Sequence, residues 1–328
     1  RSLSGPDDTA LAEQALEAVQ AIVRVRAREE VRASLADCLD GIDPERTASI
    51  LTDATDAVLG GALTVATGLV IAQRDGVEAV AGGFGADGCW EAALARHAVV
   101  AMGRLGGREI GYASDADVLF VHEARDGADD AAAAQEAEAV AKQVVGLLAS
   151  ARPHPLEVDS DLRPEGRQGV MSRSLAAYGE YYGRWAALWE RQALLRARAC
   201  AGDRELGGRF EELINPLRWA EGGLSTQDLR EIRRIKARVE TERLPRGINP
   251  VRHLKLGPGG LSDVEWSAQV LQLAHAGQIT GLRTTSTIAA LQAAVQGGLL
   301  SADDGGVLVA AWILASRLRS AIVLGTGR

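Results

Sequence analysis

The sequence predicts an α+β protein, in which a small mixed sheet with helices is flanked by an N-terminal helical segment and a C-terminal helix bundle. Three observations lead to this prediction. Residues 7–72 repeat apolar side chains at helical spacing, residues 97–162 contain short apolar runs separated by glycine-rich turns, and the pattern from residue 175 onward is again mainly helical. A chain of 328 residues is long enough for two or three packed units.

The first expected domain, residues 1–72, is entirely helical. One amphipathic run follows another, and Asp43 followed by Pro44 is a typical helix start that opens the second run. The glycine-rich stretch 82–88 then interrupts the helical period. We therefore expect a domain boundary near residue 73.

The second expected domain, residues 73–215, contains the sheet. Residues 97–102 and 116–122 are predicted to be buried strands on either side of a glycine-punctuated loop. A helix is predicted over 131–150 and a short third strand over 156–162. The predicted order is therefore strand, loop, strand, helix, strand.

The third expected domain, residues 216–328, is a helix bundle. From residue 175 to the end of the chain, the apolar spacing predicts helices over 175–185, 188–198, 226–243, 263–276, 287–296 and 303–324.

Composition favours a cytoplasmic protein with protein or small-molecule partners. The net charge of −8 argues against a nucleic-acid partner, because such binding usually depends on a basic surface. Unbroken apolar runs are far shorter than the roughly 20 residues that cross a bilayer, and no signal-peptide pattern is present, so no membrane partner is expected. Cys38, Cys89 and Cys200 are too widely spaced for a zinc site or a disulfide framework.

A glycine-rich loop followed by two aspartates indicates the chemistry. Gly103, Gly106 and Gly107 allow the backbone to approach a phosphate and offer N–H groups to it. Asp115 and Asp117 are two residues apart on a predicted strand, so both carboxylates leave the same face. They repel each other unless a divalent cation joins them, and Mg²⁺ takes oxygen ligands together with substrate phosphates. Asp159, on another predicted strand, could supply the third carboxylate of a two-metal site.

The order of two glycines, a short spacer and an Asp-x-Asp pair resembles the nucleotidyltransferase fold shared by DNA polymerase β. The string GRLGGREIGYASDADVLFVHE is similar to the bifunctional glutamine synthetase adenylyltransferase/adenylyl-removing enzyme family. Further blocks resemble that family in the same order: VDSDLRPEGRQG, WERQALLRARACAGD, LREIRRIKARVETERLPRG and LKLGPGGLSDVEW. The resemblance runs from about residue 95 to the end.

The resemblance implies a reaction. Family members have an N-terminal half that removes AMP and a C-terminal half that transfers AMP from ATP to a tyrosine of glutamine synthetase. The strings GYASDAD, RPEGR and IRRIKARVETERLPRG look most like the C-terminal half from actinobacteria, which makes AMP transfer the leading expectation. Phosphorolytic removal of AMP is one alternative, and a silent module that senses nucleotide or a PII-type signalling protein is another. By the same resemblance, the partner half and part of the helix bundle are expected to be missing.

The resemblance also assigns roles to the aspartates. Asp115 and Asp117 would bind two Mg²⁺ ions and the ATP phosphates through them, while Asp159 would hold one ion and help to deprotonate the tyrosine. Asp161 is the ambiguous neighbour, and Asp159 is favoured over it.

Contacts to the triphosphate are expected from Gly106, Gly107 and Ser114, through backbone and hydroxyl groups, and from Arg104 by its charge. Arg104 could equally be a solvated surface residue.

Several other residues carry two interpretations each. Arg163, Arg196 and Arg198 suit phosphate, but could instead pair with Glu165 or Glu190. Lys255 and its glycines look like a second phosphate loop. Asp263 and Glu265 open a helix, where an aspartate is usually a cap. The tryptophans, including Trp185, Trp189 and Trp266, are expected in the core and not against a base.

Overall fold

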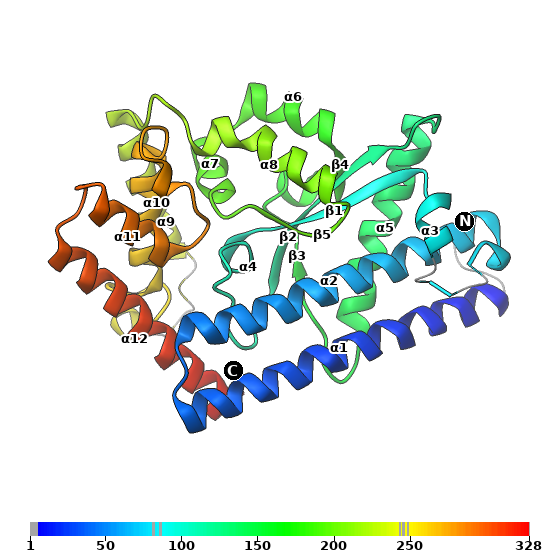
Figure 1. Cartoon of the computed structure of the whole chain (residues 1–328), viewed down its shortest axis with the longest axis horizontal. Helices are drawn as coiled ribbons and strands as arrows, with labels where there is room; N and C mark the ends of the chain where they lie inside the picture. The colour runs from blue at the N-terminus through cyan, green and yellow to red at the C-terminus, as the bar shows by residue number, and fades with distance from the viewer. Residues whose placement is uncertain are drawn as a thin grey trace.

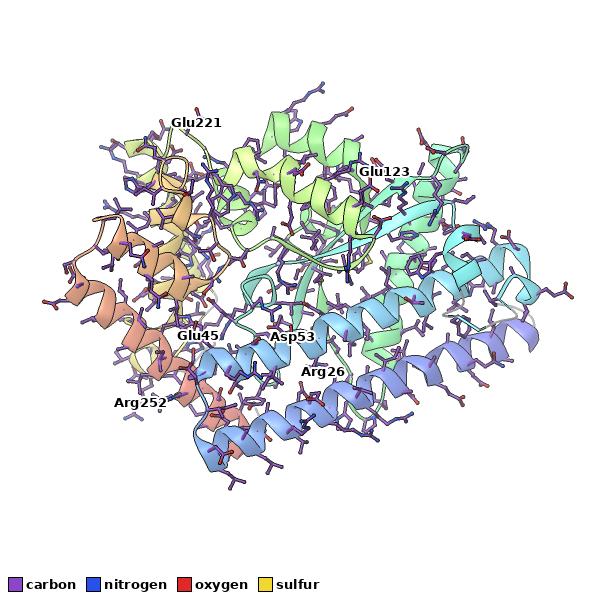
Figure 2. All side chains as sticks on the ribbon, in the orientation of Figure 1. Arg26, Glu45, Asp53, Glu123, Glu221 and Arg252 are labelled. Carbon is purple, nitrogen blue, oxygen red and sulfur yellow. The ribbon has the colours of Figure 1, made fainter. Side chains whose placement is uncertain are left out.

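The computed structural model describes residues 6–327, except 81–82, 85–86, 243, 245–246 and 248. Two long helices, α1 (Pro6–Asp40) and α2 (Pro44–Asp75), run antiparallel along one side of the molecule (Figure 1). The predicted start of the second helix is confirmed, because the Asp43 carboxylate accepts a hydrogen bond from Glu45 N and Pro44 occupies the first turn. Arg26 of α1 faces α2 and donates to Thr55 Oγ1 at 3.4 Å (Figure 2).

Five strands of the described chain form one mixed sheet in the order β3-β2-β1-β5, with β4 also paired to β2. The central pair, β1 (Ala95–Ala101) and β2 (Ala116–Ala124), is antiparallel, as are β1 and β5 (Arg198–Gly202). The short strands β3 (Val158–Asp159) and β4 (Ser172–Ser174) run parallel to β2. The predicted α+β class with a mixed sheet is confirmed.

The two faces of the sheet bury alternate residues, as the two-residue period of a strand requires. Val99 and Val118 point into a core shared with α1, α2 and α5 (Asp130–Ser150). Val100 and Leu119 point the other way, into a core with α6 (Leu175–Trp185) and α8 (Arg204–Arg218). Figure 1 shows the sheet between these helices. The N-terminal helices thus share their core with the sheet, and the domain boundary near residue 73 stays a prediction.

Several parts of this region differ from the prediction. The third strand covers only 158–159, because the chain then turns and Arg163 closes the turn with bonds to Ser160 O and Gly169 O. The helix expected over 188–198 ends early, as α7 (Leu188–Leu194), since the chain from Arg198 pairs with β1 as β5. Helix α8 and strand β4 are not predicted from the sequence. The glycine loop contains a single helical turn, α4 (Gly103–Gly106).

The C-terminal helices agree with the prediction to within two residues at each end. They are α9 (Thr226–Glu242), α10 (Leu261–His275), α11 (Thr287–Gln296) and α12 (Ala302–Thr326). Helices α10, α11 and α12 share a core that includes Leu261, Leu291 and Trp312. The end of α12 returns toward the start of α2 (Figure 1), and these two helices are in contact. A short helix, α3 (Asp87–Ala92), precedes β1.

Two described helices, α2 and α12, are long and apolar enough to cross a membrane by length and composition alone. Unbroken apolar runs understate such helices, because a few polar residues interrupt them, and the expectation of no membrane partner stays a prediction. Burial accounts for α2, whose apolar window is 67% buried, whereas that of α12 is 17% buried. Val307, Leu314 and Leu318 are exposed on α12.

Candidate metal and nucleotide site

Three carboxylates converge at one edge of the sheet. Oxygen atoms of Asp115, Asp117 and Asp159 lie within 4.8 Å of one another. Asp115 directly precedes β2, and Asp117 on β2 is the parallel partner of Asp159 on β3. Asp115 is exposed, and the other two are half-buried. An all-oxygen group of three negative charges fits a hard divalent cation such as Mg²⁺.

Asp161 does not join this group. Its carboxylate accepts from Arg167 Nε at 2.6 Å and lies 3.7 Å from Arg163 Nη1. The Asp161 N–H instead donates to Asp159 Oδ1 at 2.7 Å, which orients the Asp159 carboxylate. The structure thus brings together the three aspartates that the sequence singled out and leaves the ambiguous neighbour outside.

Gly103 lies against the carboxylate group. Its φ is +51°, and a Cβ there would lie 2.1 Å from Asp117 Oδ2. Met102 N, one residue earlier, donates to Asp117 O at 2.8 Å. A side chain at position 103 would push Asp117 away, so Gly103, one of the three glycines that the sequence predicts to approach a phosphate, lies against a carboxylate of the candidate metal site.

Gly106 and Gly107 serve close packing in this structure. A Cβ on Gly106 would lie 1.8 Å from Arg196 O, and one on Gly107 would lie 2.2 Å from Arg196 Nη1. Their N–H groups donate to Met102 O and Gly103 O at 2.7 and 3.2 Å. Phosphate contact by these two glycines stays a prediction.

Arg104 and Ser114 lie in a half-buried polar region beside the aspartates. Arg104 Nε is 3.9 Å from Glu265 Oε1 of α10, and the two side chains are 16% and 13% exposed. Arg104 is therefore not a solvated surface residue. Arg104 Nη1, Arg319 Nη1 and Ser114 Oγ are buried without a hydrogen-bond partner among the described residues. Burial first, and then the positive charge of Arg104, lowers the pKa of Arg319.

A cleft of about 710 Å³ begins at Gly103 and separates the sheet region from the C-terminal helices. Trp189 and Gln192 line one wall, and Lys255, Trp266 and Gln269 line the other. Gln192 Nε2 donates to Gln269 Oε1 across the cleft at 2.7 Å. The cleft thus offers aromatic and polar groups next to the carboxylates.

The expectation that the tryptophans belong to the core is wrong for two of the three named. Trp185 is 70% exposed and Trp189 is 41% exposed, because both lie close to the turn between α6 and α7, where the chain leaves the sheet. Trp266 is half-buried and packs against Leu188, Ile232 and their neighbours.

The loop before α10 is organised by Asp263. Its carboxylate accepts from Gly259 N at 2.6 Å and also pairs with Lys236. The N-cap of α10 is Gly260, so Asp263 is not the cap itself but, as the third residue of the helix, binds the backbone just before it. Lys255 of the same loop is exposed in the cleft.

The sequence left open whether three arginines bind phosphate or pair within the protein, and in the structure all three contact protein groups. Arg163 binds carbonyls of its own turn, Arg196 pairs with Glu109, and Arg198 forms two bonds with Asp56 at 2.8 and 3.0 Å. The predicted alternatives, Glu165 and Glu190, are engaged elsewhere: Glu165 with Arg173, and Glu190 with Tyr181 OH and Ala187 N.

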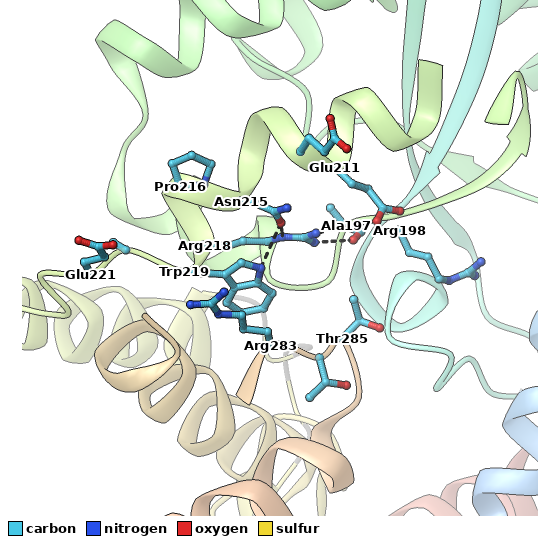
Figure 3. A pocket seen from close by; sticks show the side chains of 13 residues that line it. Ala197, Arg198, Glu211, Asn215, Pro216, Arg218, Trp219, Glu221, Arg283 and Thr285 are labelled. Atoms are coloured by element: carbon cyan, nitrogen blue, oxygen red, sulfur yellow. Dashed lines mark hydrogen bonds and ion pairs between the residues drawn. The ribbon is translucent and has the colours of Figure 1, made fainter. Parts of the chain in front are cut away.

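A second cavity, of about 830 Å³, lies beside α8 (Figure 3). Arg218 donates to Ala197 O at 2.8 Å and lies over the ring of Trp219 at 5.0 Å. Arg283 and Glu221 line the same cavity. None of the three aspartates lines either cavity. The smaller cleft is the candidate nucleotide site because Gly103, which lines it, lies against Asp117.

Comparison with known proteins identifies two matching family models. Residues 7–213 match the family model described as glutamate-ammonia ligase adenylyltransferase, and residues 231–328 match that described as GlnD PII-uridylyltransferase. A bifunctional glutamine synthetase adenylyltransferase/adenylyl-removing enzyme of Streptomyces coelicolor is 49% identical over 97% of this chain and 31% of its own length. The protein of the same description from Nocardia farcinica is 46% identical over 95% of this chain and 30% of its own length.

The chain spans about a third of the length of these relatives. The first family model covers well over half of the chain and includes all three clustered aspartates. The chain belongs to the glutamate-ammonia ligase adenylyltransferase family.

Proposed function

We propose that this chain transfers AMP from ATP to a tyrosine of glutamine synthetase, with two Mg²⁺ ions held by Asp115, Asp117 and Asp159. The observation that carries the proposal is the convergence of these three carboxylates within 4.8 Å, with Asp117 against Gly103, a residue that lines a cleft. The names of the relatives, which specify adenylyl transfer to and removal from glutamine synthetase, support the choice of substrate.

The residues around the carboxylates suit a nucleoside triphosphate. Arg104 and Arg319 place unpaired N–H donors beside the site, and Lys255 adds a charge from the opposite wall of the cleft. Trp189 and Trp266 offer aromatic surface for the base. Ser114 Oγ is a free hydroxyl next to Asp115. We assign the phosphates to the carboxylate end of the cleft and the base to the tryptophans.

The reaction would form a bond between the tyrosine oxygen and the α-phosphorus, break the bond from that phosphorus to the bridging oxygen, and release pyrophosphate. When bound, the divalent ions would neutralise the phosphate charges and favour the tyrosinate. Asp159, oriented by the Asp161 N–H, would accept the hydroxyl proton. This role requires a carboxylate with a fixed direction, which that hydrogen bond provides.

The proposed partners are glutamine synthetase and a PII-type signalling protein, with the reaction in the cytoplasm. The match of residues 231–328 to a PII-uridylyltransferase model supports the second partner. Removal of AMP is the alternative direction, because the relatives are named for both activities.

The test compares the two directions side by side. Incubation with α-labelled ATP, Mg²⁺ and unmodified glutamine synthetase should place label on the synthetase. Incubation of adenylylated synthetase with phosphate should form ADP more slowly. D117N should lose both activities, and D161N should keep them, since Asp161 pairs with Arg167 and not with the carboxylate group. Faster ADP formation would assign the chain to AMP removal.

A further inference from the structure

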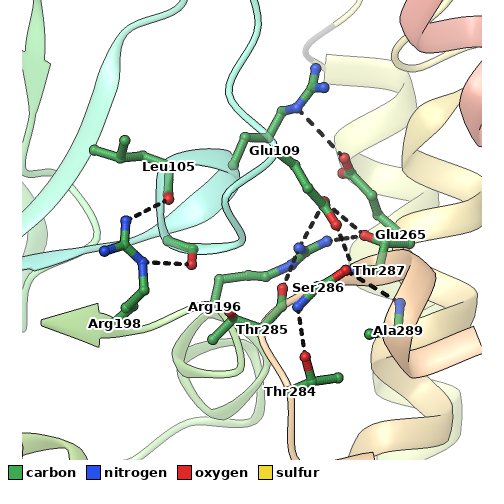
Figure 4. Close-up of polar contacts among 12 residues, drawn as sticks. Leu105, Glu109, Arg196, Arg198, Glu265, Thr284, Thr285, Ser286, Thr287 and Ala289 are labelled. Atoms are coloured by element: carbon green, nitrogen blue, oxygen red, sulfur yellow. Dashed lines mark hydrogen bonds and ion pairs between the residues drawn. The ribbon is translucent and has the colours of Figure 1, made fainter. Parts of the chain in front are cut away.

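A buried carboxylate joins the glycine loop to the C-terminal helices. Glu109 follows Gly106 and Gly107 closely in the chain and is 4% exposed. It accepts hydrogen bonds from Thr287 N at 2.5 Å, Thr287 Oγ1 at 2.8 Å and Arg196 Nη1 at 2.8 Å (Figure 4). Thr287 is the first residue of α11, so one side chain connects the loop to a helix start 178 residues away.

Arg196 completes this network from the link between α7 and β5. It is 5% exposed and donates to Thr285 O at 2.6 Å as well as to Thr287 Oγ1 and Glu109. Its guanidinium is thus occupied by protein acceptors and is not available to a phosphate. We call Glu109, Arg196, Thr285 and Thr287 the Glu109 bridge.

The glycine loop rests directly on this bridge. A Cβ on Gly107 would lie 2.2 Å from Arg196 Nη1 and 3.0 Å from Thr285 O. At its other end the loop touches Asp117 through Gly103. A shift of the bridge would therefore move the backbone that contacts a metal-site carboxylate.

The same bridge connects the two walls of the cleft. Arg196 itself lines the cleft together with Gly103, while Glu265 and Trp266 line it from α10. Helix α10 packs against α11, which begins at Thr287 of the bridge. A buried ion pair is a poor source of net stability, because desolvation offsets its Coulombic attraction, but its directional bonds fix one relative position.

We propose that Glu109, Arg196 and Thr287 are positioning residues that hold the glycine loop and the C-terminal wall of the cleft in the relative position that Mg·ATP binding requires. This inference rests on the proposed function for its ligand. Its structural part, that the bridge holds residues 103–108 in place, can be tested without nucleotide.

The test uses E109Q and T287V, which remove charge or hydroxyl with little change in volume, and T287S, which keeps the hydroxyl. E136Q is the matched control. Glu136 is also a buried carboxylate, 5% exposed, that pairs with an arginine, Arg74, and accepts from backbone N–H groups, those of Leu94 and Ala95. It lies on α5, in the core on the far side of β1 from α11.

Two quantities are measured on each variant. Urea unfolding gives the stability of each variant, so that variants of equal stability are compared. Hydrogen exchange of residues 103–108 without nucleotide should rise in E109Q and T287V and stay unchanged in E136Q. The Kd for Mg·ATP by calorimetry should rise about tenfold in the first two, the loss expected from one buried unpaired polar group. T287S, which keeps the hydroxyl, should show the exchange and the Kd of the unaltered protein.

The outcomes separate a failure of the positioning role from a failure of the proposed function. If the unaltered protein does not bind Mg·ATP, the proposed function fails, and the exchange of residues 103–108 still tests the bridge. If it binds, and T287V shows the same Kd and exchange as the unaltered protein, the positioning role is overturned. Equal weakening by E136Q at matched stability would also overturn it, since the effect would then be general. If E109Q does not fold, the comparison of T287V with T287S decides whether the bridge positions the loop.

Discussion

At the scale of single residues, the site depends on which carboxylates the fold brings together. Asp161 lies only two residues from Asp159 in the chain, yet Arg167 and Arg163 surround its carboxylate. Asp159 instead accepts a hydrogen bond from the backbone N–H of Asp161 and is the partner of Asp117 in the β2–β3 pair. The local contacts thus make Asp159 a candidate metal ligand and Asp161 a structural residue, although both are aspartates.

Replacing Asp117 by Asn should lower AMP transfer on the order of a thousandfold while leaving the melting temperature nearly unchanged, because several kcal/mol of metal-assisted stabilisation are lost and the packing is retained. Initial rates with labelled ATP and thermal unfolding measure the two effects. D161N is the control and should retain activity. Near-normal transfer by D117N would contradict the metal assignment.

Replacing Gly103 by Ala should cost about 1–3 kcal/mol of stability, because alanine is strained at a positive φ. It should also weaken Mg·ATP binding, because the new Cβ would lie 2.1 Å from Asp117 Oδ2. G127A is the control: Gly127 has φ +83° and nothing within 4 Å of its Cβ position. Both variants should lose stability in urea titrations, and only G103A should lose affinity. Equal affinities would show that the loop does not set the Asp117 position.

At the scale of elements, the sequence predicts best where one period dominates. The helices α9 to α12 and the β1–β2 pair follow from apolar spacing alone. Strand β5 is not predicted because Arg198–Gly202 consists of small and charged residues without β-branched side chains, and it is a strand only through its pairing with β1. Helix α8 buries Leu206, Phe210 and Ile214 at helical spacing, but two glycines and Pro216 obscure that period.

The residues of the site also divide into those that local sequence predicts and those that depend on long-range contacts. The sequence singles out all three aspartates, since their chemistry is local. It could not predict the contacts of Glu109 with Thr287, because that pairing joins segments 178 residues apart and no spacing rule connects them.

The β1–β2 pair also predicts a pH effect on stability. His97 and His122 are direct partners on these strands and both are buried. Burial lowers the pKa of His97 to about 3 and that of His122 to about 4. Both are therefore neutral when folded at pH 5, whereas in the unfolded chain they bind protons below about pH 6.5.

Because the unfolded state binds more protons between about pH 6.5 and pH 4, these histidines make the protein less stable as the pH falls through that window, by up to about 1.4 kcal/mol per pH unit for each. Urea midpoints at pH 7, 6 and 5 measure the effect. H122Q, which cannot titrate, should show a smaller decrease. A flat profile for the unaltered protein would show that the two rings are protonated in the folded state.

At the scale of the whole molecule, the candidate site belongs to two regions at once. The carboxylates belong to the sheet and the residue before it, whereas the C-terminal region lines the cleft with Glu265 and Trp266 of α10 and with Lys255 of the preceding loop. Figure 1 shows these helices beyond the ends of the strands near α4, with α12 returning to α2. Nucleotide binding should therefore join the regions, and stability should increase only when ion and phosphates bind together, because three carboxylates alone hold Mg²⁺ poorly.

The measurement that tests the metal and nucleotide site most directly is thermal unfolding with ATP in Mg²⁺, with ATP in EDTA and with Mg²⁺ alone, for the unaltered protein, D117N and D161N. We expect the melting temperature to rise for the unaltered protein and D161N only when ATP and Mg²⁺ are both present, and D117N to show no such rise. An equal rise with ATP in EDTA, or an equal rise in D117N, would contradict a nucleotide site built on these three aspartates.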